Sequence, residues 1–404
     1  MQKFTGMQYL QIDIANSFGL DKENWDTRLQ WAAENEDRLD DLVPEAKDPA
    51  MYFAGVQAYR AAQAGKPIGY PISLDATSSG LQILAALTGD RRAAELCNVV
   101  DTGNREDAYT GVFEIMVNEL DGMGQPTGSI ERDDVKQAVM TSLYGSEAVP
   151  KEVFGTGIQL NVFYRVMNAV APAAWELNQA FLDLWDSEAL INSWVLPDNF
   201  HVHVKVMQRV EETVHFLNEP YTVFHKVNAP TEEGRSLGAN TIHSIDGMIV
   251  REMTRRCDYD VDRVLKVTEA LLNDEMGGGG LGRPEDTMVS ILWGHYQRTG
   301  YLSARILDYL DLSNMGLVVK EVIWELVRSL PEKPFKIMAV HDCFRVLPNY
   351  GNDLRTQYNN QLMLIARSNL LQDLLSQIVK RDLEIGKLDE NLWRDIPFTN
   401  YALS

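Results

Sequence analysis

The sequence is poor in cysteine and has no long apolar run. Its 404 residues contain three cysteines, Cys97, Cys257 and Cys343, which lie far apart and form no CxxC pair. This spacing excludes a disulfide framework and a cysteine-based zinc site, and it fits free thiols in a reducing compartment. No apolar run of about eighteen residues is present, so we expect no membrane span. The N-terminus also lacks the basic region and apolar core of a signal peptide.

Positive charge is scarce as well. The chain has 37 Lys and Arg against 58 Asp and Glu, which gives a net charge of −21. Taken alone, this argues against nucleic-acid binding, because phosphate contacts need Lys and Arg. Net charge is an average, however, and a local basic cleft can exist inside an acidic shell. The 45% hydrophobic content predicts a soluble globular protein with a sizeable core.

The periodicity of apolar residues predicts an α+β fold. Residues 69–75 read as a strand, and the alternation in "HVHVKV" and "YTVFHKV" predicts a β-hairpin near 200–227. The glycine-rich stretch 277–286 lacks the GK[ST] ending of a phosphate loop, so we expect a hinge or an exposed loop there. Helical spacing is found in residues 75–97, 105–120, 131–145, 300–330 and 351–395.

A charged group interrupts two apolar strands in "FKIMAVHDCFRVLP", residues 335–348. His341 and Cys343 would project to one face of an extended strand and Asp342 to the other, and no nucleophile signature surrounds the thiol. A metal ligand is the better interpretation of Asp342. Asp75 follows the apolar strand "YPISL" in the same way. Two strand-end aspartates that meet at one sheet edge could hold two Mg²⁺ ions.

A third element lies in "RDDVKQAVMTSLYGS". Arg132 and Lys136 are four residues apart, so they lie on one face of a helix and could grip a triphosphate. Tyr144 and Gly145 follow at the helix end, where an aromatic ring could stack on a base or touch a sugar. For the helix alone, two ordinary surface cations on an amphipathic helix would be the better interpretation.

Taken together and in this order, these motifs resemble motifs A, B and C of the single-subunit, phage-type (phage and mitochondrial) RNA polymerases. They are Asp75 in "DATSSGLQ", the spacing Arg132-xxx-Lys136-x7-Tyr144-Gly145, and "HDC" at 341–343. "ANTIHSIDG" at 239–247 resembles the HSQDG-type segment of that family. Residues 105–120 resemble its fingers helix, and "RDIPFTNYALS" resembles its C-terminal foot.

The resemblance implies a polymerase right-hand fold, with palm and fingers present and the N-terminal domain and thumb missing. The palm would comprise residues 1–100 and 244–404, with an insertion at about 250–330. Residues 101–243 would form the fingers, with a specificity hairpin at about 200–227.

The resemblance also assigns roles to individual residues. Asp75, the Ala76 carbonyl and Asp342 would hold two Mg²⁺ ions. Tyr144 and His243 would recognise the ribose 2′-OH. Arg132 and Lys136 would bind the phosphates, and Lys136 would also protonate the leaving group. His341 would lie near the primer terminus, and Gly145 and Tyr109 would line the same cleft.

Three features favour ribonucleotides over deoxynucleotides. The stretch after Asp75 lacks the glutamate that related DNA polymerases use to block the 2′-OH. Cys343 stands where their motif C carries an acid, and no extra aromatic-Gly pair precedes Tyr144. Two alternatives stay open: a reduced family A-type DNA polymerase, and a noncatalytic nucleic-acid-binding subunit descended from a polymerase.

The expected partners are a DNA template, an RNA product and nucleoside triphosphates. The missing parts and the negative charge together predict a heterodimer, in which a second polypeptide supplies the N-terminal domain and thumb. We also expect an accessory factor for promoter opening and no membrane association. The resemblance implies a phage-encoded enzyme in the cytoplasm of a bacterial host.

Overall fold

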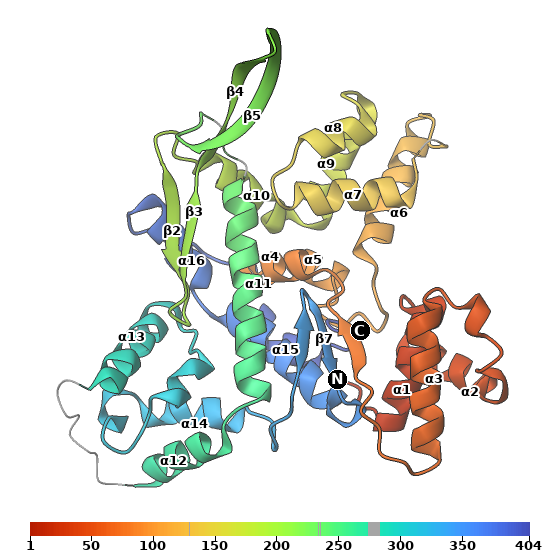
Figure 1. The fold of residues 1–404 in the computed structure, drawn as a ribbon, viewed down its shortest axis with the longest axis vertical. Helices are drawn as coiled ribbons and strands as arrows, with labels where there is room; N and C mark the ends of the chain where they lie inside the picture. Colours follow the sequence, from red (N-terminus) through yellow and green to blue (C-terminus); the bar gives the residue numbers. More distant parts are fainter. Residues whose placement is uncertain (129, 233, 235, 274–282) are drawn as a thin grey trace.

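A small antiparallel sheet lies at the centre of the molecule (Figure 1). The structure is a computed structural model, and it describes all residues except 129, 233, 235 and 274–282. The sheet has the strand order β1 (Ile72–Asp75), β7 (Cys343–Val346), β6 (Met338–Val340), and both pairings are antiparallel. Segments from both ends of the chain therefore meet in one sheet.

The N-terminal helices pack beside this sheet. They are α1 (Gly6–Ala15), α2 (Trp25–Glu34) and α3 (Pro49–Gln63), and α1 packs on both of the others (Figure 1). The α1 helix begins at a capping box, because the Thr5 side chain accepts from the Gln8 backbone and the Gln8 side chain accepts from the Thr5 backbone. This reciprocal pair fixes the entry of α1 against the sheet.

The helix that follows β1 is buried on all sides. It is α4 (Ser79–Thr88), and α5 (Arg91–Leu96) follows it. A helix that is apolar around its whole circumference belongs inside a core. Three helices cover α4: α10 (Pro172–Asp183), α11 (Ser236–Cys257) and α15 (Gly351–Arg367). The loop between β1 and α4 is thus anchored from both sides.

The expected helices at 105–120 and 131–145 are confirmed as α6 (Ala108–Gly122) and α7 (Arg132–Ser142). With α8 (Ala148–Phe154) and α9 (Ile158–Val170) they form a layer on one side of the molecule (Figure 1). The long helix α11 runs between this layer and the second core described below. Mixed helix and sheet of this kind agrees with the predicted α+β class.

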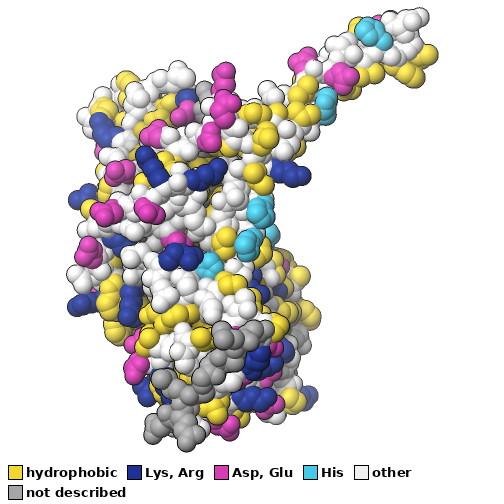
Figure 2. All heavy atoms as spheres, turned by 90° about the vertical axis from the view of Figure 1, so that its left-hand side faces the viewer, with side chains coloured by type: hydrophobic (Ala, Val, Ile, Leu, Met, Phe, Trp, Pro, Cys, Tyr) yellow, Lys and Arg dark blue, Asp and Glu magenta, His cyan; other side chains and the backbone are white. Residues whose placement is uncertain are grey.

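A hairpin is present near 200–227, as expected, but the expected pairing of 201–206 with 221–227 is wrong. The structure has two successive hairpins, β2 (Ile191–Val195) with β3 (His201–Lys205), and β4 (Met207–Phe216) with β5 (Glu219–Asn228). The alternation in 201–206 and 221–227 indicated the strands correctly but did not show their partners, since strand pairing is a long-range choice. The β4–β5 ribbon projects well away from the body (Figures 1 and 2).

A second, separate hydrophobic core lies in the part of the chain expected to be an insertion. Its helices are α12 (Val261–Leu272), α13 (Pro284–Thr299) and α14 (Lys320–Arg328). The helices expected at about 300–330 are confirmed only in part, by α14, because residues 304–308 and 315–317 form short 3₁₀ turns. In the glycine-rich stretch 277–286, residues 277–282 lie outside the described residues.

The chain after α15 returns to the sheet. Residues 351–395 are expected to be mostly helical, and this is confirmed as far as residue 379, where α16 (Leu370–Val379) ends. Beyond it, residues 392–394 form a 3₁₀ turn. Backbone hydrogen bonds then join residues 402–404 to residues 75–77 at the end of β1. Within the described chain, no helix combines the length and the apolar character needed to span a membrane.

Candidate active site

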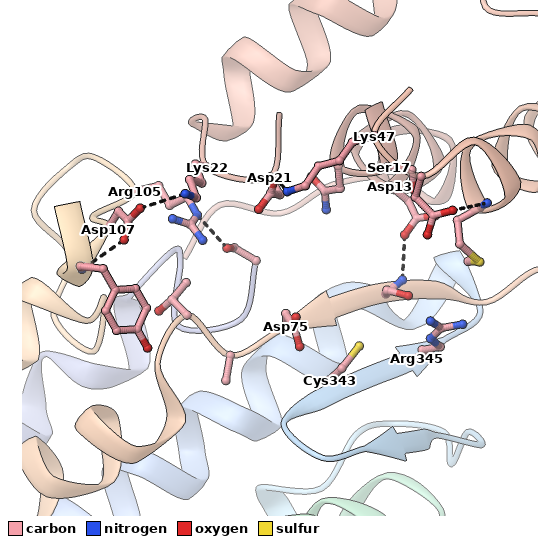
Figure 3. A pocket seen from close by; sticks show the side chains of 18 of the residues that line it. Asp13, Ser17, Asp21, Lys22, Lys47, Asp75, Arg105, Asp107, Cys343 and Arg345 are labelled. Carbon is pink, nitrogen blue, oxygen red and sulfur yellow. Dashed lines mark hydrogen bonds and ion pairs between the residues drawn. The ribbon is translucent and has the colours of Figure 1, made fainter. Parts of the chain in front are cut away.

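The register of β1 and β7 decides which side chains face the site. Asp75 pairs with Cys343, and Leu74 pairs with Phe344. Directly opposite residues of an antiparallel pair share a face, and the face alternates along each strand. Leu74 and Phe344 are buried in the core. Asp75 and Cys343 therefore project to the other face, where they line a cavity of about 660 Å³ (Figure 3).

The β6–β7 turn brings Asp342 to Asp75. Val340 pairs with Cys343, so His341 and Asp342 alone form the turn, and His341 has a left-handed φ of 57°. Such φ values match the tight hairpin turns whose twist suits a sheet. The Ala76 amide donates to the Asp342 carbonyl at 3.1 Å, which ties the turn to the end of β1. The two strand-end aspartates thus meet at one sheet edge.

The charge of Asp342 affects the ionisation of Asp75. Loss of hydration raises the pKa of Asp75 above its ordinary value, although its side chain is still exposed on one side, and the negative charge of Asp342 raises it further. Burial and the Asp75 charge raise the pKa of the Cys343 thiol to about 11. That thiol is protonated at neutral pH, which argues against its use as a nucleophile.

A third carboxylate, Asp246, lies near Asp342 and was not singled out from the sequence. Burial raises its pKa to about 6, with a further contribution from the charge of Asp342. It projects from α11 three residues after His243, so a helical reading of "HSIDG" would have placed both on one side. The Tyr144 ring lies 4.8 Å from the His243 ring, and burial raises the pKa of Tyr144 to about 12.

The two cations of α7 differ in their surroundings. Arg132 forms an ion pair with Asp107 and donates to the Thr110 hydroxyl at 2.7 Å. Burial opposes ionisation of Asp107, but the Arg132 contact outweighs it and lowers the pKa of Asp107 to about 2. Lys136 forms no ion pair among the described residues, and its Nζ lies 5.7 Å from the Tyr109 ring centroid. Only Lys136 therefore has its charge free for a ligand.

Glycine at position 80 leaves room for Tyr144. A Cβ built on Gly80 would lie 2.5 Å from the Tyr144 hydroxyl and 3.1 Å from its ring carbon. Any larger residue would have to displace the ring. Gly80 belongs to the "DATSSGLQ" stretch. The sequence shows that this stretch lacks an acid, but it does not show the contact with Tyr144.

The loop after Asp75 is held by one buried amide. The Nε2 of Gln82, fully buried in α4, lies 3.0 Å from each of three acceptors, the Thr77 hydroxyl and the Cys97 and Ala402 carbonyls, which share its two hydrogens. Its oxygen accepts from Tyr358 at 2.8 Å. Gln82 thus joins the loop, the C-terminal segment and α15, and sequence reasoning missed it because its partners are distant in the chain.

The cavity contains part of the expected site. Asp75, Ala76, Tyr109, Arg132 and Lys136 line it. The other expected residues lie outside its lining, around the β6–β7 turn and the α7–α11 contact: Asp342, His341, Tyr144, Gly145 and His243.

The charge of the cavity differs from that of the whole chain. Six cations line it: Lys22, Lys47, Arg105, Arg132, Lys136 and Arg345. Five carboxylates line it: Asp13, Asp21, Asp48, Asp75 and Asp107. Within a chain of net charge −21, this balance is locally favourable to anions.

The donor groups at the sheet edge suit a hard divalent cation. Asp75 and Asp342 offer carboxylate oxygens, which Mg²⁺ prefers, and a cation between them would relieve the repulsion that raises the pKa of Asp75. Among the described residues, no cluster of three or more His, Cys, Asp and Glu is arranged to hold a metal. The site is thus a carboxylate pair that leaves room for substrate oxygens.

Two neighbouring carboxylates at the end of a small antiparallel sheet, one of which lines a cavity that also contains six cations, define a site suited to phosphate chemistry. Residues 3–154 match the family model described as DNA-dependent RNA polymerase. The chain is 31% identical over 164 residues to the mitochondrial DNA-directed RNA polymerase of Neurospora crassa, a match covering 35% of this chain and 12% of that protein. It is 30% identical over 172 residues to the DNA-directed RNA polymerase of Pseudomonas phage phiKMV, covering 35% of this chain and 21% of that one.

A longer match covers most of the chain. It is 23% identical over 391 residues to a probable DNA-directed RNA polymerase of Gelasinospora, covering 88% of this chain and 41% of the relative. These matches show that the chain is similar to DNA-directed RNA polymerases of mitochondria and phages, with the family model matching residues 3–154. The chain spans less than half the length of these relatives.

Proposed function

We propose that this chain is the catalytic part of a DNA-directed RNA polymerase and adds ribonucleotides to an RNA 3′ end. One observation carries the proposal: β1 and β7 come from distant parts of the sequence, and their pairing brings the β6–β7 turn with Asp342 to Asp75, which lines a cavity that contains six cations. A noncatalytic binding subunit would not require this pair of like charges, whose mutual repulsion is unfavourable without a cation.

Asp75, Asp342 and the Ala76 carbonyl are the groups that would hold two Mg²⁺ ions. When bound, Mg²⁺ lowers the pKa of an attacking hydroxyl and neutralises charge on a triphosphate. Lys136 binds the triphosphate, because its charge is unpaired among the described side chains of the cavity. It can also donate a proton to the leaving pyrophosphate. Arg132 is paired with Asp107, so it attracts the phosphates through its electrostatic field and does not contact them directly.

Tyr144 and His243 form the sugar-recognition group in this proposal. Their rings are in contact, and the Tyr144 hydroxyl lies above Gly80, close to the end of the β1–α4 loop. A hydroxyl and an imidazole can pair with a ribose 2′-OH, which both donates and accepts hydrogen bonds. His341, in the turn beside Asp342, lies where the primer terminus would approach. We assign template or promoter contact to the projecting β4–β5 ribbon.

A second polypeptide is part of the proposal. The relatives are more than twice as long as the part that this chain matches. The chain also carries a net charge of −21, which opposes binding of a polyanion outside the cavity. A partner that brings positive charge would remove this difficulty, and an accessory factor could open the promoter.

Primer extension tests the function directly. The chain, purified alone and together with any polypeptide that co-purifies, is given an RNA primer on a DNA template with Mg²⁺ and either ribo- or deoxynucleotides. We expect ribonucleotide addition that Asp75→Asn and Asp342→Asn each abolish without loss of folding. Preference for deoxynucleotides would support the alternative of a reduced DNA polymerase. Salt-resistant full activity of the isolated chain would contradict the need for a partner.

A further inference from the structure

We infer that Arg345 binds a backbone phosphate of the RNA strand next to its reacting 3′ end. This inference rests on the proposed function and extends it to a residue outside the three motifs. Arg345 lies on β7 opposite Ser73, on the same sheet face as Asp75 and Cys343, and it lines the same cavity (Figure 3).

The Arg345 guanidinium has unused hydrogen-bonding capacity. It contacts the Cys343 thiol and lies in the field of Asp13 and Asp75. It forms no ion pair within the described part of the chain, and its buried Nε has no hydrogen-bond partner there. A buried N–H without a partner is unfavourable, so a ligand that accepts from it is favoured. Arginine presents a rigid fork of donors that matches phosphate oxygens.

The position of Arg345 relative to Asp75 identifies which phosphate it meets. Tyr109 contacts Ser78 at 3.4 Å, and Lys136 lies over the Tyr109 ring, so these groups lie beyond the carboxyl end of β1. Arg345 pairs with Ser73, two residues before Asp75, which corresponds to about 7 Å along the strand in the opposite direction. Asp75 therefore lies between Arg345 and the part of the cavity that contains Lys136. Figure 3 shows Asp75 between Asp107 on one side and Arg345 on the other.

The geometry of phosphoryl transfer indicates which substrate lies on each side of Asp75. The attacking and leaving oxygens lie roughly in line on opposite sides of the transferred phosphorus. If Lys136 holds the triphosphate and its leaving pyrophosphate, the strand that carries the attacking 3′-OH approaches from the Arg345 side. Arg345 is thus placed to neutralise the RNA phosphodiester on the 5′ side of the 3′-terminal nucleotide.

The test combines a protein change with a matched change in the RNA. The full chain, with any polypeptide that co-purifies, extends RNA primers on a DNA template, and the primers carry one uncharged methylphosphonate at each of the last three linkages in turn. We expect Arg345→Gln to raise the KM for primer–template by about ten- to a hundredfold, as for loss of one charged contact, and to leave the KM for the nucleotide unchanged. One methylphosphonate should have the same effect on the wild type and no further effect on Arg345→Gln.

Arg345→Lys should restore part of the affinity, and Arg328→Gln, which removes an exposed cation on α14, should have no effect. Fluorescence anisotropy with the same labelled duplexes gives the affinities without any extension. The inference would be overturned if each methylphosphonate weakened primer–template binding equally in Arg345→Gln and in the wild type. A change confined to the KM for the nucleotide would also overturn it. Failure of the wild type to extend any primer would instead contradict the proposed function, and the anisotropy comparison would still decide the role of Arg345.

Discussion

The Tyr144 hydroxyl lies so close to Gly80 that a single methyl group at position 80 would overlap it: an added Cβ would lie 2.5 Å from that oxygen. Gly80 follows the β1 strand that carries Asp75, and Tyr144 follows the helix that carries Lys136. This contact joins the metal-binding and phosphate-binding parts of the proposed site. It also fixes where the hydroxyl points.

Gly80→Ala should therefore weaken sugar discrimination by displacing the Tyr144 ring. We expect a destabilisation of about 1–3 kcal/mol from overpacking, and a lower preference for ribonucleotides than in the wild type. Tyr144→Phe removes the hydroxyl without displacing the ring, so it should lower discrimination by up to about tenfold, the value of one neutral hydrogen bond. The ratio of kcat/KM for a ribo- and a deoxynucleotide measures both. Unchanged ratios in both variants would exclude Tyr144 from sugar recognition.

Asp75→Asn should separate stability from activity. The variant removes one of two neighbouring like charges, so its thermal midpoint without divalent cations should equal or exceed that of the wild type, while nucleotide addition is lost. Mg²⁺ should raise the midpoint of the wild type and not that of the variant, because a ligand that binds only the folded state stabilises it. Thermal unfolding with and without Mg²⁺ measures this. Equal Mg²⁺ responses would contradict the assignment of the ligands.

Asp246→Asn provides the matched control for that experiment. Asp246 also lies near Asp342 but is not an assigned ligand. It should keep the Mg²⁺ response of the wild type. A lost response in this variant would add Asp246 to the metal ligands.

Asp13 should make stability fall as pH rises from about 4 to about 6. Burial raises its pKa in the folded protein to about 6 from an ordinary value of 3.8, although it accepts from the Ser73 amide and the Tyr70 hydroxyl. The folded state binds the proton more tightly in that window, so deprotonation lowers the unfolding free energy, by roughly 3 kcal/mol in full. Asp13→Asn should flatten this part of the pH profile. Thermal midpoints of both proteins at pH 4.5 to 7 measure it, and parallel profiles would exclude Asp13 as the cause.

Removal of residues 402–404 should disturb the site from a distance. Their backbone pairs with residues 75–77, and the Ala402 carbonyl accepts from Gln82. Loss of these contacts should lower the rate of nucleotide addition and, through the lost backbone hydrogen bonds, lower the free energy of unfolding by about 1–3 kcal/mol. Gln82→Leu should reproduce the loss of stability. Chemical denaturation and primer extension measure the two effects, and an active, fully stable truncated chain would contradict the prediction.

The sequence by itself determined the local features of this protein. Apolar runs that end in Asp75 and Asp342 predicted strands with carboxylates at their ends. The helical spacing of 105–120 and 131–145 predicted α6 and α7, because periodicity is a property of neighbouring residues. The order and spacing of the motifs indicated a resemblance to RNA polymerases, and residues 3–154 match the family model described as DNA-dependent RNA polymerase.

Only the tertiary structure decided which of these features meet. It paired 201–205 with 191–195 instead of with 221–227, and it gave Arg132 a partner in Asp107, so that Lys136 is the cation of α7 without an ion pair among the described residues. It also placed Arg345 in the cavity and Gly80 beneath Tyr144. Each of these depends on contacts between segments far apart in the chain, and local propensity does not encode such contacts.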